Sequence, residues 1–163
     1  MLTILVKNED ERKNWAMQLR VLVFEDEPTI LRPICTFLRA QGYEVLGFPT
    51  PIACSLVSDD DCKCPHDRSC ADILITDMKM PKMTGLEMIH LMADKGCYIP
   101  PQNKIVISSA ITIEQEEELE SLGCHFLPKP FQLGDLLDLV RACGKNISPD
   151  RELIPTEILE GNR

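Results

Sequence analysis

Residues 73–85 read ILITDMKMPKMTG, an apolar run that ends in one carboxylate and passes through a turn into the start of a helix. The apolar residues before Asp77 predict a strand that is buried on both faces. A proline and a glycine in this stretch are typical of turns, and Thr84, followed three residues later by Glu87, predicts a capped helix start. This order places Asp77 at the carboxyl end of a parallel strand, where open α/β sheets hold their reactive groups.

Three other apolar runs of the chain also end in polar or charged residues. Run 20–24 is followed by Glu25 and Asp26, run 105–107 by Ser108 and Ser109, and run 125–127 by Pro128 and Lys129. Because the carboxyl ends of parallel strands meet at one edge of a sheet, we expect these side chains to gather around Asp77.

The gathered residue types predict a particular chemistry. Carboxylates at adjacent strand ends repel one another, so their natural occupant is a hard cation such as Mg²⁺, which takes oxygen ligands. Lys129 supplies a positive charge for a phosphate group, and Ser108 supplies a hydroxyl that can donate to a phosphoryl oxygen. A carboxylate can itself accept a phosphoryl group. The set therefore predicts a metal-assisted acyl-phosphate site, although a single strand-end aspartate more often caps a helix or forms a turn.

The alternation of strands and helices along the chain predicts one α/β domain with a doubly wound, five-stranded parallel sheet. We expect it at residues 19–143, with an insertion at 58–71, after an N-terminal extension at 1–18 and before a polar C-terminal tail at 144–163. Within the first expected helix, Pro33 predicts a late start or a kink. A further short helix is expected at 52–57, after a cap at Thr50.

Composition narrows the class of protein. The 163 residues include 26 acids and 17 bases, for a net charge of −9, which disfavours direct binding of nucleic acid. No run of about eighteen apolar residues is present to span a membrane, and the first residues lack the features of a signal peptide. We therefore expect a cytoplasmic protein whose eight cysteines are thiols or metal ligands rather than a disulfide framework.

The insertion is rich in soft metal ligands, namely Cys62, Cys64, His66 and Cys70, with Cys54 shortly before it. Tetrahedral Zn²⁺ takes four Cys or His ligands, so Cys62, Cys64 and Cys70 with either Cys54 or His66 form a possible second metal site. The spacing also fits a reduced loop with accidental thiols, or a redox-sensing pair. The sequence leaves these three readings open.

The run Asp-x-x-Met-Pro-x-Met-x-Gly that starts at Asp77, together with the closing Lys129-Pro130-Phe131, resembles the receiver domain of two-component response regulators. The resemblance covers residues 19 to 143. It implies a flavodoxin-like fold with strand order 2-1-3-4-5. It also implies a cis peptide bond between Lys129 and Pro130.

The resemblance also implies residue roles. Asp77 is expected to be the residue phosphorylated by a histidine kinase. Glu25, Asp26 and Asp77 would hold Mg²⁺, together with the backbone carbonyl of Lys79.

Three further positions complete the implied site. Lys129 would bind the phosphate, Ser108 would be the switching hydroxyl, and Phe126 falls at the aromatic switch position. Ser109 stands beside Ser108 and is not excluded from the hydroxyl role, although spacing favours Ser108.

The function implied is that of a stand-alone phosphoacceptor module, which is not an enzyme beyond its own phosphorylation and dephosphorylation. Its partners would be a sensor histidine kinase or phosphotransfer protein and a downstream protein, with no direct nucleic acid and no membrane. The alternative is a metal-binding or redox-sensing module that uses residues 54–70 on a receiver scaffold. A phosphatase of the haloacid dehalogenase type is disfavoured, because that class requires a second Asp where this chain has Lys79.

Overall fold

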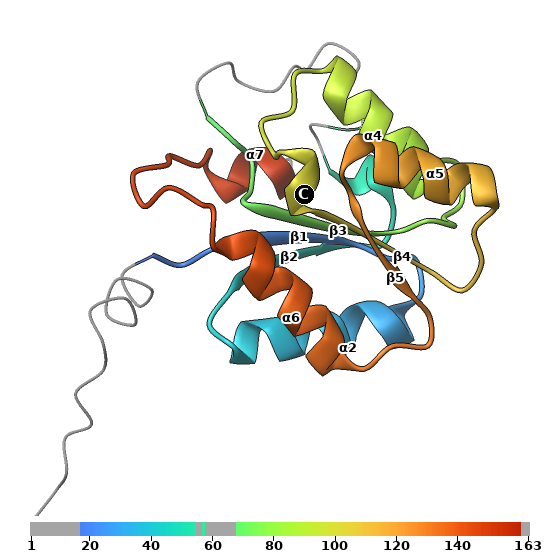
Figure 1. The fold of residues 1–163 in the computed structure, drawn as a ribbon. Helices are drawn as coiled ribbons and strands as arrows, with labels where there is room; N and C mark the ends of the chain where they lie inside the picture. The colour runs from blue at the N-terminus through green and yellow to red at the C-terminus, as the bar shows by residue number, and fades with distance from the viewer. Residues whose placement is uncertain (1–16, 55–56, 58–67, 161–163) are drawn as a thin grey trace, which may run out of the picture.

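The computed structural model describes residues 17–54, 57 and 68–160. The middle layer of the domain is a parallel sheet of five strands in the order β2-β1-β3-β4-β5 (Figure 1). The strands are β1 (Arg20–Phe24), β2 (Glu44–Phe48), β3 (Ile73–Asp77), β4 (Lys104–Ser108) and β5 (His125–Pro128). The predicted fold class and strand order are confirmed.

Helices cover both faces of this sheet (Figure 1). On one face lie α2 (Pro28–Ala40) and α6 (Leu133–Gly144), and on the other lie α4 (Gly85–Asp94) and α5 (Ile113–Leu122). The remaining described elements are the 3₁₀ turns Pro51–Ala53 and Pro101–Asn103 and the short helix α7 (Thr156–Glu160). Of the helix predicted at 52–57, the described residues show the first of these turns, whose Ile52 amide is capped by the Thr50 hydroxyl as expected, and a helical residue at Val57.

Local capping explains where the helices begin. The Thr84 hydroxyl accepts a hydrogen bond from the Glu87 amide at 3.1 Å, and the Glu87 carboxylate accepts one from the Thr84 amide at 2.7 Å, which confirms the predicted capping box. In α2, the late start suggested by Pro33 is wrong, because the helix begins at Pro28 and continues through Pro33. Proline suits the first helical position, and three buried side chains further along hold α2 against the sheet.

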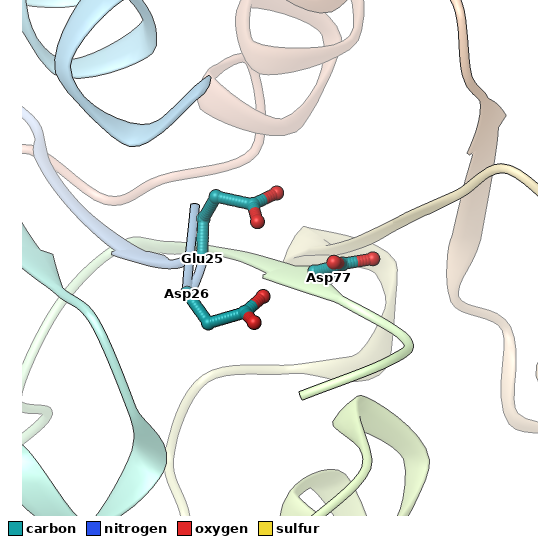
Figure 2. Close-up of side chains that lie close together, drawn as sticks. All are labelled: Glu25, Asp26 and Asp77. Atoms are coloured by element: carbon teal, nitrogen blue, oxygen red, sulfur yellow. The ribbon is translucent and has the colours of Figure 1, made fainter. Parts of the chain in front are cut away.

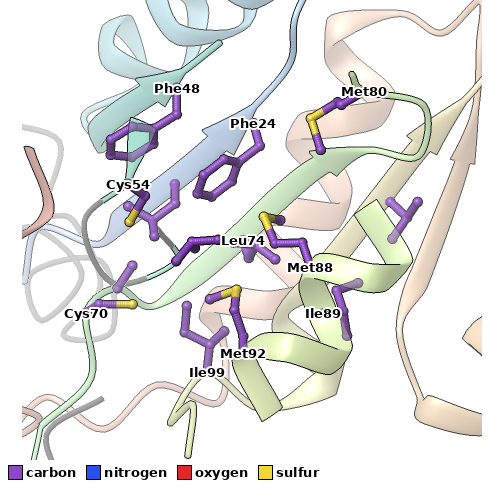
Figure 3. Close-up of a cluster of buried hydrophobic side chains, with 14 of the residues drawn as sticks. Phe24, Phe48, Cys54, Cys70, Leu74, Met80, Met88, Ile89, Met92 and Ile99 are labelled. Atoms are coloured by element: carbon purple, nitrogen blue, oxygen red, sulfur yellow. The ribbon is translucent and has the colours of Figure 1, made fainter. Parts of the chain in front are cut away.

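The strands separate two hydrophobic cores. Along β3, Ile73 and Ile75 face α2 and α6, in what we call the α2-side core, whereas Leu74 faces α4 and α5, in the α4-side core. Figure 3 shows the α4-side core, in which the rings of Phe24 and Phe48 stack with centroids 5.1 Å apart. The continuous apolar runs therefore reflect strands that are buried on both faces, as predicted.

The expected polar tail is wrong for residues 148–160, which pack against the domain and which we call the C-terminal strap. Ile154 and Leu159 of the strap are buried in the α4-side core. The Ile154 amide donates to the Ser69 carbonyl at 3.0 Å, and the Arg20 guanidinium donates to the Ile154 carbonyl at 2.7 Å. Two aliphatic side chains in a polar stretch give no periodic signal, which is why the sequence did not reveal this packing.

No helix in the described part of the chain has the length and apolar character needed to cross a bilayer.

Candidate functional site

Three carboxylates meet at the carboxyl edge of the sheet (Figure 2). Glu25 and Asp26 follow β1 directly, and Asp77 is the last residue of the neighbouring strand β3. One ligand oxygen from each of the three lies within 4.8 Å of the others. The strand-end positions predicted from the sequence thus come together in space.

Lys129 reaches the same point from the end of β5. Its Nζ lies 2.9 Å from Glu25 Oε2 and 3.3 Å from Asp77 Oδ2. Its amide donates to the Ser108 carbonyl at 2.8 Å, which ties the start of the following loop to β4. The peptide bond between Lys129 and Pro130 is cis, as the resemblance implied.

Burial and neighbouring charges shift the pKa values of Glu25 and Lys129 in opposite directions. Glu25 is fully buried, and this desolvation raises the pKa of its carboxyl, although the hydrogen bonds from Lys129 and from the Glu27 amide oppose the rise. For Lys129, desolvation alone would lower the pKa, but the contacts with Glu25 and Asp77 outweigh it, and the pKa is raised. Lys129 therefore remains an ammonium that offsets part of the negative charge.

The donor set fits a small divalent cation. Asp26 is half-buried, and its carboxylate accepts no hydrogen bond among the described residues. Among the described residues, Asp77 Oδ1 accepts a single long hydrogen bond, at 3.4 Å, from the Lys79 amide. Oxygen donors with free lone pairs suit Mg²⁺, and the three carboxylates are the only such group within the described ranges 17–54, 57 and 68–160.

The amino-acid sequence matches a known protein family. The sequence model of the response regulator receiver domain matches residues 21–141. The chain belongs to this family. It is therefore a receiver domain of two-component signalling, a signalling module rather than a conventional enzyme.

Curated relatives of this receiver domain include the response regulator MprA of Mycolicibacterium vanbaalenii, which is 27% identical over 136 residues, and MprA of Mycobacterium tuberculosis, which is 26% identical over the same length. Each alignment covers 82% of this chain and 54% of the relative. The chain thus spans about half the length of the curated relatives it matches.

Solved structures show the same fold. The crystal structure of FixJ-N has a TM-score of 0.62 and 22% identity, and the match covers 81% of this chain and 98% of that one. The chemotaxis protein CheY4 of Vibrio cholerae has a TM-score of 0.59 and 22% identity, covering 78% and 99%. At this level of identity the likeness supports the fold alone.

The two candidate hydroxyls, those of Ser108 and Ser109, lie in different surroundings. Ser108 is buried, and its hydroxyl donates to the Ala110 carbonyl at 2.9 Å. Asp77 pairs with Ile107 in the sheet, and Ser109 comes two residues after Ile107, just past the end of β4. Ser109 is exposed and lines a groove together with Lys129. The geometry therefore favours Ser109 over Ser108.

Phe126 lies within β5 and is half-buried against the α4-side core. It sits three residues before Lys129 on the edge strand, not among the acidic residues. Its role as a switch stays a prediction.

Backbone contacts between distant parts of the chain hold Asp77 in place. The Met78 amide donates to the Ile107 carbonyl at 2.9 Å, and the Gly85 amide donates to the Met78 carbonyl at 2.9 Å. The first residue of α4, Gly85, lies so close to β3 that a Cβ added there would be 2.3 Å from the Asp77 carbonyl oxygen. Because Gly85 has no side chain, α4 can begin this close to the end of β3.

The loop after Asp77 also contains a strained residue. Lys82 has a φ of 70°, in the left-handed region that favours glycine. Relief of this strain exceeds the entropy cost of glycine, so Lys82→Gly should raise the free energy of unfolding by about 0.5–1 kcal/mol. Lys82→Ala removes the same side chain but keeps the strain, so it should give no such gain. Urea denaturation of both variants compares them, and equal stability would contradict the expectation.

Two cysteines of the expected zinc site, Cys54 and Cys70, are among the described residues. Cys54 and Cys70 are buried in the α4-side core (Figure 3), and burial raises the pKa of Cys70 to about 12. Cys62, Cys64 and His66 of the expected zinc site lie outside the described residues. Since no cysteine cluster in the described part of the chain could hold a metal, nothing here supports the metal-binding alternative.

Proposed function

We propose that this receiver domain accepts a phosphoryl group on Asp77 from a phosphohistidine, with the help of Mg²⁺, and then presents a changed surface to a downstream protein. The donor would be a sensor histidine kinase or a phosphotransfer protein. The observation that supports this most directly is the meeting of Asp77 with Glu25, Asp26 and Lys129 at one sheet edge.

The chemistry follows from the positions of the side chains. An oxygen of the Asp77 carboxylate attacks phosphorus, so a P–O bond forms while the P–N bond to the donor histidine breaks. When bound, Mg²⁺ would offset the charge of the carboxylates and of the phosphoryl oxygens. The carboxylates of Glu25, Asp26 and Asp77 are available to hold it, and the carbonyl of Lys79 would complete the set that the resemblance implies.

Lys129 and Ser109 would bind the transferred group. The Lys129 ammonium already lies 3.3 Å from Asp77 Oδ2, so it can donate to a phosphoryl oxygen with a small movement. The Ser109 hydroxyl lines the same groove as Lys129, and we assign it the switching role that was expected of Ser108.

A groove beside the site suits the phosphodonor. It has a volume of about 420 Å³ and runs between the start of α2 and the loop that precedes α6. Its walls include the apolar side chains of Ile30, Pro33 and Phe131, next to the polar groups of Lys129 and Ser109. A helix of the donor with an apolar face could pack here and bring its histidine to Asp77.

The downstream partner would bind along the β5 edge of the sheet, where α5 and α6 flank the last strand (Figure 1). The α5 helix carries a run of glutamates, at 114, 116, 117, 118 and 120. An acidic surface favours a basic protein partner over DNA.

The function is tested by treating the protein with a small phosphodonor and Mg²⁺ and measuring its mass. Wild type should gain one phosphate, and Asp77→Asn should gain none, because an amide oxygen is a much weaker nucleophile than a carboxylate. Omission of Mg²⁺ should suppress labelling of wild type. Labelling of Asp77→Asn to the wild-type extent would refute the assignment.

A further inference from the structure

We propose that residues 12–15, which read RKNW, occupy a pocket at the amino-terminal edge of the sheet, with their basic side chains against two acids of the C-terminal strap. These residues lie outside the described part of the chain, but the pocket and the point at which the segment joins the domain lie within it. The pocket borders the start of β3, whereas Asp77 is the last residue of that strand. It therefore lies at the opposite edge from the acidic site.

The pocket forms where three parts of the chain meet. Its walls come from the segment that enters β3, from the loop between α4 and β4, and from the turn that leads from α6 into the strap (Figure 1). Its volume is about 500 Å³, which is within the range of about 300–1,000 Å³ that is typical of ligand sites. Tyr98 is 48% exposed and lines the pocket together with Pro100 and Ile147, so one wall can receive an aromatic side chain.

The charge of the pocket is negative. Arg151 and Asp72 neutralise each other, because the guanidinium donates to both carboxylate oxygens, at 2.8 Å and 2.7 Å. Asp150 and Glu152, on either side of Arg151, are exposed, and their carboxylates have no hydrogen bond or ion pair with the described residues. Two unpaired carboxylates favour a basic occupant over an acidic one.

The chain enters the domain at the rim of this pocket. The Gln18 carbonyl accepts a hydrogen bond from Arg151 at 2.9 Å, and Arg151 lines the pocket. Residues 12–15 come three to six positions before Gln18. An extended chain spans about 3.3–3.6 Å per residue, so Trp15 is within about 11 Å of this contact along the chain and Arg12 within about 22 Å. The whole segment can therefore reach the pocket.

The segment has the chemistry that the pocket requires. Arg12 and Lys13 supply two positive charges for the two carboxylates, and Trp15, the only tryptophan, supplies an amphipathic ring for the apolar wall. Three acids at 9–11 precede the bases, so the bound part begins at Arg12. A short tether gives an effective concentration on the order of millimolar, so weak contacts are sufficient. The segment would then hold the strap from outside, while Asp72 holds it from inside.

Trp15 fluorescence tests the proposal in the full-length chain, because no other tryptophan contributes to the signal. In the double variant Asp150→Asn/Glu152→Gln, the emission should shift to longer wavelength. Acrylamide should quench the indole at least about twofold more strongly than in wild type, since loss of two ion pairs weakens binding severalfold. The control Glu117→Gln/Glu120→Gln neutralises two exposed acids of α5, outside the pocket, and should leave both signals unchanged.

A charge exchange gives the second test. Asp150→Lys/Glu152→Lys should release the indole, and addition of Arg12→Glu/Lys13→Glu to that variant should restore its protection from acrylamide. Unchanged Trp15 quenching in both pocket variants would overturn the proposal. Protection that increases with protein concentration would also overturn it, because it would mean that the segment binds a second copy of the chain.

Discussion

Gly85→Ala should destabilise the domain by about 3 kcal/mol or more, because a side chain at this position meets backbone rather than a movable side chain. The added Cβ would lie 2.3 Å from the Asp77 carbonyl oxygen and 3.1 Å from two atoms of Thr76. To relieve the contact, α4 must move away from the end of β3. That movement would also displace Asp77, so phosphate labelling should fall together with stability.

Gly134→Ala is the matched control. Gly134 lies in α6, and a Cβ added there has no atom within 4 Å. Alanine is the better helix former, so this variant should be as stable as wild type or up to about 1 kcal/mol more stable. Urea denaturation measures both. A Gly85→Ala variant that matches Gly134→Ala in stability would show that α4 does not approach the strand this closely.

Arg151→Met should detach the C-terminal strap and lower the free energy of unfolding by about 2–3 kcal/mol, since it leaves a buried carboxylate without its main partner. Arg151 donates to both oxygens of Asp72, at 2.8 Å and 2.7 Å, and also to the Gln18 carbonyl at 2.9 Å. The Asp72 side chain is only 2% exposed and would keep a single hydrogen bond, from the Arg20 amide.

Hydrogen exchange gives a local measure of this effect. The Ile154 amide, which donates to the Ser69 carbonyl, should exchange faster in Arg151→Met. Lys145→Met removes the same charge from an exposed position, so it should change stability by no more than about 0.5 kcal/mol. In the double variant with Asp72→Asn, the losses should be less than additive, because the second change removes the unpaired charge. Strict additivity would mean that the ion pair does not hold the strap.

Much of the fold could be predicted because its signals are local. The strand that ends in Asp77 and the strand that ends just before Glu25 are largely apolar runs, and the capping box at Thr84 marks the start of α4 through hydrogen bonds between residues three positions apart. Both patterns depend on neighbours in the sequence. The acidic site could be predicted for the same reason, since each of its residues ends an apolar run.

Features that depend on distant contacts could not be predicted. The choice between Ser108 and Ser109 depends on the register of β4 against β3, where a shift of one residue reverses the side that each hydroxyl faces. The hydrogen bond between Lys129 and Glu25 joins residues that are 104 positions apart. The packing of the strap depends on Asp72 and Arg151, whose charges give no sign in the sequence that they will pair.

The composition of the two cores gives the molecule one stiff side and one compliant side. The buried members of the α2-side core are valines, isoleucines, leucines and two cysteines, whereas the α4-side core contains Met78, Met80, Met88 and Met92. Branched side chains hold a few well-defined rotamers, but methionine is flexible and can fill cavities of changing shape. Met78 directly follows Asp77, so a chemical change at Asp77 is one residue away from the methionine-containing core beneath α4, where we expect repacking to require less energy than on the α2 side.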